Sequence, residues 1–286
     1  MSKKIITNKQ NTILTLLLTF RFLNSKQIQQ FLSHKDHRRI NGWLKDLTDK
    51  GYIDRDFTPI YGILTKPAVF NLSSIGRKYI RDNYQDVSMK YLGKLREDKD
   101  RSKSFRVKCQ IVADLYLAHY PDKVDKFIEK MKEHLTDGLI LEDNKNGQFF
   151  TSAFYEVLEE IIPILKLKPD AYMYDKTKEG ITHCAFYVLD AYVPRLMLQY
   201  FLKNIFTTLD EEYWEEDDIE SLQIYVLCPN NMVIIYLRRL LKSFLERYYG
   251  KLLIFHFATR NQLSKRIKTK SGKTGWITVS SEDETE

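Results

Sequence analysis

The chain has 286 residues, of which 43% are hydrophobic and 13% aromatic, and its formal net charge is +7. This length and composition allow two buried cores, so we expect two domains and exclude a disordered protein. Cys109, Cys184 and Cys228 are widely separated in the sequence, which excludes a disulfide framework and a zinc site and is typical of reduced thiols in a cytoplasmic protein.

Positive charge is concentrated in the first third of the chain. Residues 1–103 contain 21 lysines and arginines against 10 aspartates and glutamates, whereas residues 104–286 contain 24 against 28. This asymmetry predicts a phosphate-facing surface in the N-terminal part. The apolar run Ile13 to Leu18 is too short to cross a bilayer or to act as a signal peptide, so we expect no membrane partner.

Three helices are predicted near the N-terminus. Apolar residues recur at steps of three and four over residues 8–22, and the same spacing over residues 25–33 follows a capping pair, Asn24 and Ser25. A tight turn at residues 33–35 then leads into a third helix over residues 35–49, whose apolar residues share one arc.

The outward face of the third helix is basic and polar. Arg38 and Lys45 fall opposite the apolar arc, and Asn41 and Gly42 lie nearby. Such a face can enter the major groove of DNA, where Arg reads guanine and Asn reads adenine; the alternative is a solvated helix surface. The candidate DNA contacts on this helix are Lys35, His37, Arg38, Arg39, Asn41 and Lys45.

A hairpin is predicted after the third helix. Gly51 provides the helix C-cap, and short strands over residues 52–57 and 66–72 flank a loop that contains proline and glycine. Arg55 and Lys66 are candidate phosphate contacts, or else solubilising charges at a strand edge. A further helix begins after Ser73. Together these elements predict a winged helix-turn-helix, an α+β DNA-binding domain, over residues 1–85.

The rest of the chain predicts a second domain. Residues 86–103 are charge-dense and favour a helical linker, residues 104–275 an α/β domain, and residues 276–286 a disordered acidic tail. Strands are expected at 171–174, 184–189, 222–228 and 252–257, helices at 105–118, 194–209 and 231–249, while 149–158 is ambiguous. Their alternation favours a central, partly parallel sheet.

Several short phrases in the chain match a known family. Residues 167–172 (LKPDAY), the strand 185–190 (AFYVLD), a helix containing Lys203, and residues 69–76 (VFNLSSIG) at the end of the hairpin resemble the bacterial replication-relaxation family. The resemblance covers most of the chain. It implies a protein of plasmids, phages or conjugative elements that joins a winged helix to an α/β nuclease-like (restriction-endonuclease-like) domain of the PD-(D/E)xK type.

The nuclease chemistry of that fold requires two carboxylates and a lysine. Asp170 matches the first carboxylate, but Val188 occupies the place of the second, and Asp190 replaces the lysine. Because valine cannot bind Mg²⁺, we expect a vestigial nuclease site at Glu156, Asp170 and Asp190, with no catalytic residue, metal or cofactor. Asp170 and Asp190 can alternatively serve as turn and capping residues.

Other catalytic motifs are absent from the sequence. It contains no GxxxxGK[ST], HExxH, GxSxG or GxGxxG pattern. The acidic run from Asp210 to Glu220, with Tyr213 and Trp214 inside it, is typical of a solvated loop, or else it binds a basic partner or shields the second domain from DNA.

Together these patterns predict a non-enzymatic, site-selective DNA-binding protein that acts in replication or relaxation of a mobile element, or in its control. The expected partners are double-stranded DNA, a second copy in a homodimer, and replication or transfer proteins docked on the second domain. The alternatives are a transcriptional regulator, a metal-dependent nuclease or nicking enzyme, and an adaptor that does not contact DNA.

Overall fold

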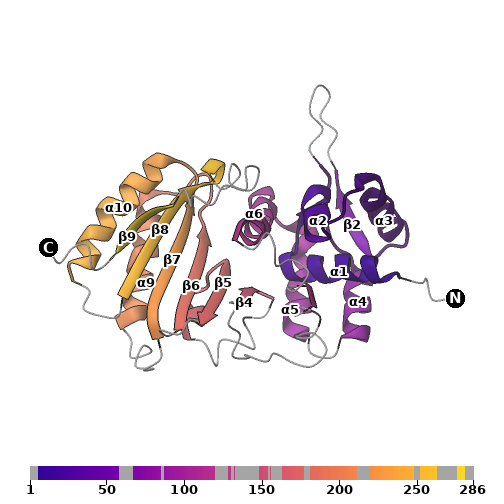
Figure 1. Cartoon of the computed structure of the whole chain (residues 1–286), viewed down its shortest axis with the longest axis horizontal. Helices are drawn as coiled ribbons and strands as arrows, with labels where there is room; N and C mark the ends of the chain where they lie inside the picture. Colours follow the sequence, from indigo (N-terminus) through magenta and orange to yellow (C-terminus); the bar gives the residue numbers. More distant parts are fainter. Residues whose placement is uncertain are drawn as a thin grey trace, which may run out of the picture. The chain divides into compact units, whose positions relative to one another are not determined.

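A computed structural model of the chain divides into two compact units, residues 1–140 and 141–286 (Figure 1). The structure describes residues 6–57, 67–84, 87–119, 128–129, 132, 148–153, 155, 163–176, 181–210, 219–247, 252–262 and 276–280. Within these ranges no helix has the length and apolar content needed to cross a membrane.

Three helices open the first unit, as the sequence predicts. They are α1 (Asn8–Phe20), α2 (Ser25–Phe31) and α3 (His37–Asp49). Thr7 and Asn24 form capping boxes at the starts of α1 and α2, and Asp36 caps α3, so a side chain accepts from at least one free backbone N–H group in each first turn. Three members of the predicted apolar arc of α3, Ile40, Leu44 and Leu47, are buried, and the fourth, Trp43, is half-buried.

A small antiparallel sheet completes this arrangement. Its strands are β1 (Leu23–Asn24), β2 (Ile53–Asp56) and β3 (Val69–Leu72), in the order β1-β3-β2. The sequence does not predict β1, which has two residues and is defined by its pairing with β3. The predicted glycine at the end of α3 is confirmed, since Gly51 has a φ of 80°, although the C-cap itself is Lys50.

The helix α4 (Ser74–Asn83) fastens the hairpin to the end of α3. The Ser73 hydroxyl donates a hydrogen bond to the Gly51 carbonyl, and the Ser73 N–H donates to the Tyr52 carbonyl at 3.1 Å. Gly76 packs so closely that an added Cβ would lie 2.1 Å from the Tyr52 oxygen. Only glycine therefore fits at this position without a backbone shift.

The segment predicted as a charged linker is instead packed into the first unit. It forms α5 (Met89–Lys94) and the 3₁₀ helix η1 (Leu95–Asp100). The buried Tyr91 hydroxyl donates to the Leu18 carbonyl at 2.8 Å, and the buried Asp98 pairs with Arg21. The segment is helical, as expected, but it is not a linker, because these buried contacts hold it on the N-terminal core.

The helix α6 (Lys103–His119) also packs in the first unit, against α1, α2 and β1. Gln27 of α2 donates a hydrogen bond of 2.7 Å to the Asp114 carboxylate of α6. The sequence places the start of the second domain at residue 104, whereas the structure divides after residue 140. The difference arises because α6 joins the N-terminal core.

A six-stranded mixed sheet forms the second unit, in the order β4-β5-β6-β7-β8-β9. Its strands are β4 (Gln148–Thr151), β5 (Ala171–Lys176), β6 (Ile181–Val188), β7 (Ile219–Cys228), β8 (Leu252–Thr259) and β9 (Ile277–Ser280). The strands β6, β7 and β8 are parallel, and the other pairings are antiparallel. The prediction of a partly parallel sheet is confirmed, but the prediction of a disordered tail is wrong for residues 277–280.

Two crossover helices cover one face of this sheet. The helix α9 (Arg195–Asp210) connects β6 to β7, and α10 (Asn231–Leu245) connects β7 to β8 (Figure 1). Phe206 of α9 stacks on Phe244 of α10 and on Phe255 of β8, with ring centroids 5.1 and 6.2 Å apart. The two helices therefore share one core with the sheet. The mixed α and β composition agrees with the predicted fold class.

Candidate nucleic-acid interface

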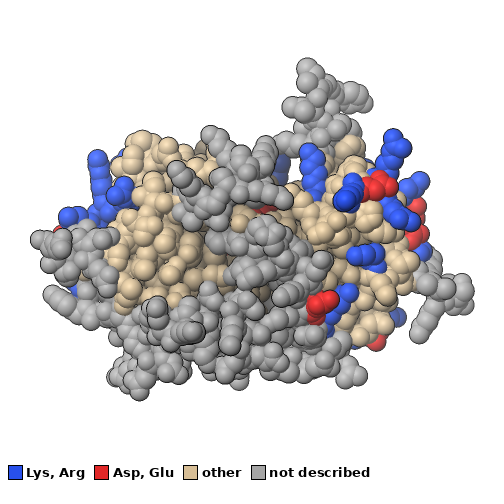
Figure 2. Space-filling model, in the orientation of Figure 1, with Lys and Arg blue, Asp and Glu red and all other residues tan. Residues whose placement is uncertain are grey.

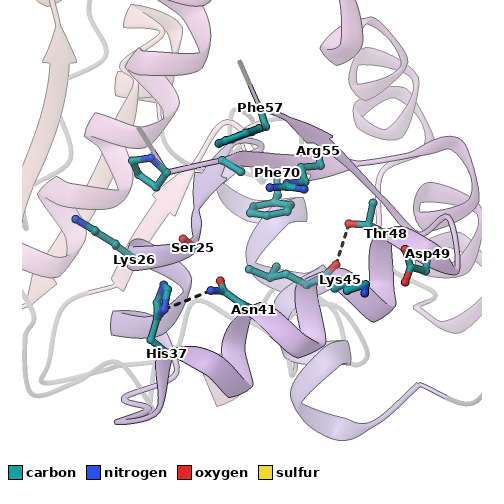
Figure 3. A pocket seen from close by; sticks show the side chains of 13 residues that line it. Ser25, Lys26, His37, Asn41, Lys45, Thr48, Asp49, Arg55, Phe57 and Phe70 are labelled. Atoms are coloured by element: carbon teal, nitrogen blue, oxygen red, sulfur yellow. Dashed lines mark hydrogen bonds between the residues drawn. The ribbon is translucent and has the colours of Figure 1, made fainter. Parts of the chain in front are cut away.

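A groove of about 730 Å³ opens between α3, the start of α2 and the β2–β3 hairpin (Figure 3). Four predicted DNA contacts come together here: His37, Asn41, Lys45 and Arg55. The other lining residues are Ser25, Lys26, Leu44, Thr48, Asp49, Phe57, Pro67, Ala68 and Phe70. The predicted face of α3 and the predicted hairpin charge thus border the same groove.

The wall formed by α3 follows from its helical spacing. His37, Asn41, Lys45 and Thr48 recur at steps of three and four, so they lie on one side of the helix, next to its buried residues. Asn41 Nδ2 lies 3.3 Å from His37 Nδ1, and the Thr48 hydroxyl donates to the Leu44 carbonyl at 2.8 Å. The Lys45 side chain is exposed and lines the groove, so its ammonium group is available to a ligand there.

On the hairpin side of the groove, a cation lies over an aromatic ring. The guanidinium of Arg55 lies 4.8 Å from the ring centroid of the exposed Phe57, and Arg55 pairs with Phe70 across the strands. The carboxylate of Asp56, the next residue on β2, forms an ion pair with Arg106 of α6. That pairing neutralises an acidic neighbour of Arg55.

A third cation comes from α2, and sequence reasoning missed it. Lys26 is exposed and lines the groove together with Ser25. No signal in the local sequence distinguishes Lys26 from a solvated lysine, because its place depends on how α2 packs against α3. The groove lining contains three cations, Lys26, Lys45 and Arg55, and one carboxylate, Asp49, so the groove favours an anionic ligand.

The remaining predicted contacts lie outside the groove lining. Lys35, Arg38 and Arg39 are exposed. Arg38 lies about 60° from Asn41 around α3 and extends the same face, whereas Arg39 lies about 160° away, at 100° per residue. Lys66 lies outside the described residues. Figure 2 shows Lys and Arg side chains projecting from the surface of the first unit.

The predicted vestigial nuclease position has a structural role in the second unit. Asp170 Oδ2 accepts a hydrogen bond of 2.8 Å from the Val188 N–H, and the Asp170 N–H donates to the Phe186 carbonyl at 2.8 Å. The carboxylate thus joins the start of β5 to the end of β6. Asp190 is exposed, and Glu156 lies outside the described residues.

Buried phenols surround this position. Burial raises the pKa of the Tyr155 and Tyr187 hydroxyls, and the negative charge of nearby Asp170 raises both further. The Tyr187 hydroxyl donates to the Leu167 carbonyl at 3.2 Å. In the described part of the chain, no group of three or more His, Cys, Asp or Glu side chains is placed to hold a metal ion.

Comparison with known proteins identifies one family. No curated protein and no solved structure matches the chain significantly. Residues 14–188 match the model of a family described as replication-relaxation, a span that includes α3, the hairpin and Asp170. Because this match covers more than half of the chain, the protein belongs to the replication-relaxation family.

Proposed function

We propose that this protein is a non-enzymatic, site-selective binder of double-stranded DNA that acts in the replication or relaxation of a mobile element, or in its control. In this proposal the first unit is a winged helix, with α3 entering the major groove and the β2–β3 hairpin contacting the backbone. The element order α1-β1-α2-α3-β2-β3 and the sheet order β1-β3-β2 support this assignment.

The groove between α3 and the hairpin is the observation that carries the proposal. It combines an exposed amide, Asn41, with cations from three elements, Lys26, Lys45 and Arg55. Cations bind phosphate regardless of sequence, while an amide on a helix can hydrogen-bond the edge of adenine. This combination matches site-selective binding better than a purely electrostatic surface.

The second unit serves in this proposal as a scaffold for docking partner proteins and for homodimerisation, in the cytoplasm of the host cell. The residues at the predicted nuclease position argue against catalysis. Asp170 is engaged by the Val188 N–H, and the neighbouring positions offer a valine and an aspartate where a nuclease needs a carboxylate and a lysine.

The test is DNA binding by matched charge reversals. A duplex selected from a random pool by the full-length protein would be measured by fluorescence anisotropy over a range of salt concentrations. Lys45→Glu with Arg55→Glu is expected to weaken binding by at least about 100-fold and to flatten the salt dependence, because phosphate contacts are lost. The control, Arg239→Glu with Lys242→Glu on α10, makes the same charge change in the second unit.

We expect the control to change the affinity by less than about threefold. Equal losses in the two variants would replace the proposed groove by a diffuse electrostatic attraction. Cleavage of supercoiled plasmid with Mg²⁺ or Mn²⁺ by the wild-type protein would contradict the non-enzymatic part of the proposal.

A further inference from the structure

Several large apolar side chains are exposed on the outward faces of α9 and α10. On α9, Leu196 is 58% exposed and Tyr200 50%; on α10, Met232 is 72% exposed and Ile235 43%. Met197 and the preceding Tyr192 are exposed as well. Single exposed apolar residues are common on protein surfaces, but a contiguous group of them marks a binding site.

The two helices lie side by side, so their outward faces form one surface. Gln199 of α9 donates a hydrogen bond of 3.2 Å to the Tyr236 hydroxyl of α10. The guanidinium of Arg195 lies 5.5 Å from the ring centroid of Tyr236. These contacts link the N-terminal halves of both helices, which are also the halves that carry the exposed apolar side chains.

Three cations lie in the C-terminal halves of the same helices, one on α9 and two on α10. Lys203 lies two turns beyond Leu196 and one turn beyond Tyr200 on α9, and Arg239 and Lys242 lie beyond Met232 and Ile235 on α10. All three cations are exposed. Figure 2 shows a group of Lys and Arg side chains over the α10 end of the second unit. We call this combined surface, with its apolar and basic halves, the α9–α10 face.

The chemistry of the α9–α10 face limits its occupants. Most of its exposed apolar side chains, such as Leu196, Met232 and Ile235, are not aromatic, so apart from Tyr192 and Tyr200 they offer neither a flat ring for base stacking nor a donor for phosphate. Nucleic acid therefore fits them poorly. Two copies of the face can pair only in arrangements that keep Lys203, Arg239 and Lys242 of one copy away from those of the other, whereas an acidic partner meets no such restriction. An occupant with apolar and acidic residues satisfies both halves.

We propose that the α9–α10 face docks an acidic amphipathic helix of a partner protein. An apolar stripe at i, i+3, i+4 and i+7 on that helix would cover Leu196, Met232 and Ile235, and its carboxylates would meet the basic halves. Flexible methionines such as Met232 suit a surface that adapts to an incoming helix. The inference rests on the docking role proposed for the second unit and is independent of the DNA groove.

The test uses the full-length protein and two designed peptides. Both are fluorescein-labelled, 18 residues long, with leucine at i, i+3, i+4 and i+7; one has glutamates at the remaining positions and the other lysines. We expect fluorescence anisotropy to give a Kd of about 10 µM for the acidic peptide and binding at least about tenfold weaker for the basic one.

Matched variants locate the binding site. Met232→Ser with Ile235→Ser is expected to weaken binding of the acidic peptide at least about tenfold, because the apolar contact is lost. The control, Met89→Ser with Val107→Ser, removes two exposed apolar side chains of the first unit and should leave peptide binding unchanged. All four side chains are exposed, so both variants should melt as the wild type does, which circular dichroism would check.

Other outcomes would overturn the proposal. No saturable binding of the acidic peptide, or equal binding of the two peptides, would remove the proposed partner chemistry. A dimer that dissociates on Met232→Ser with Ile235→Ser, measured by sedimentation velocity, would assign the face to a second copy of the chain. A loss of DNA affinity in the same variant would assign it to nucleic acid, and neither result would alter the test of the α3 groove.

Discussion

The helices α3 and α10 have similar buried faces and different exposed faces. Each buries a stripe of aliphatic residues, Ile40, Leu44 and Leu47 in α3 and Ile234, Leu237 and Leu241 in α10. Outward, α3 presents His37, Asn41 and Lys45, whereas the first turns of α10 present Met232 and Ile235. The inner stripe fixes how a helix packs, and the outer face fixes what it can bind.

This difference separates two classes of ligand. The polar face of α3 keeps its cations hydrated until a polyanion displaces the water and counterions. The apolar half of the α9–α10 face gains free energy only when another apolar surface covers it. Perturbing one region should therefore leave the other intact.

The largest expected difference between the two regions comes from Gly76, in the first turn of α4 beside the hairpin. Gly76→Ala should lower the free energy of unfolding by about 2 kcal/mol, because the new Cβ would meet the Tyr52 carbonyl oxygen at 2.1 Å and the backbone must move. The strain acts on the hairpin beside α3, so DNA affinity should fall while peptide binding to the α9–α10 face persists. Urea denaturation and both binding assays would measure these effects.

Gly42 on the exposed side of α3 provides the control. An added Cβ there meets nothing within 4 Å, so Gly42→Ala should stabilise the protein by about 0.5–1 kcal/mol through its helix propensity. If both glycine variants changed stability by the same amount, the close contact of Gly76 with Tyr52 would not be the cause.

A smaller effect is expected from Asn41, whose substitution should distinguish contacts to bases from contacts to phosphates. Asn41→Ala should reduce discrimination at one base pair of the selected site by about tenfold, because its amide is the side chain on the groove wall suited to an adenine edge. Ser243→Ala removes an exposed polar group of α10 and should leave the preference unchanged. Competition with duplexes mutated at each position would measure both. A uniform loss of affinity without altered preference would limit Asn41 to backbone contacts.

The smallest effect is a pH dependence confined to the first unit. Burial between α6 and α2 raises the pKa of Asp114 from 3.8 to about 6, partly offset by the hydrogen bond from Gln27. The folded state therefore holds this proton more tightly, so its contribution to stability falls as pH rises from about 4 to about 6 and stays low above. Asp114→Asn should stabilise the protein by about 1 kcal/mol at pH 7.5.

That gain should disappear near pH 4, where the carboxyl is protonated in the folded state, and DNA affinity at pH 7.5 should not change. Thermal melts of both proteins across this range would test the assignment. A gain that persists unchanged at pH 4 would point to packing rather than to titration of Asp114.

Much of the first unit could be predicted from the sequence because its signals are local. The caps at Asn24 and Ser73, Gly51 at the end of α3 and the buried stripe of that helix depend on neighbours within a few residues. The groove residues His37, Asn41, Lys45 and Arg55 could be named for the same reason, but Lys26 could not, because its position depends on packing between helices.

Elements that depend on partners distant in the sequence could not be predicted. The strand β1 exists through its pairing with β3, and β9 through its pairing with β8 next to an acidic tail. Tyr91 and Asp98 lie in a charge-dense segment, and their burial depends on Leu18 and Arg21, more than 70 residues earlier. The exposure of the apolar residues on α9 and α10 could not be predicted for a similar reason, since helix periodicity alone does not say which face the sheet covers.

The bond from the Val188 N–H to Asp170 affects how any future mutant at this position is interpreted. Removing the carboxylate with alanine would strip a backbone amide of its acceptor, so lost function could reflect a damaged scaffold as easily as a missing metal ligand. Asparagine keeps an oxygen for that amide while abolishing the charge, which makes it the substitution that can tell architecture from catalysis.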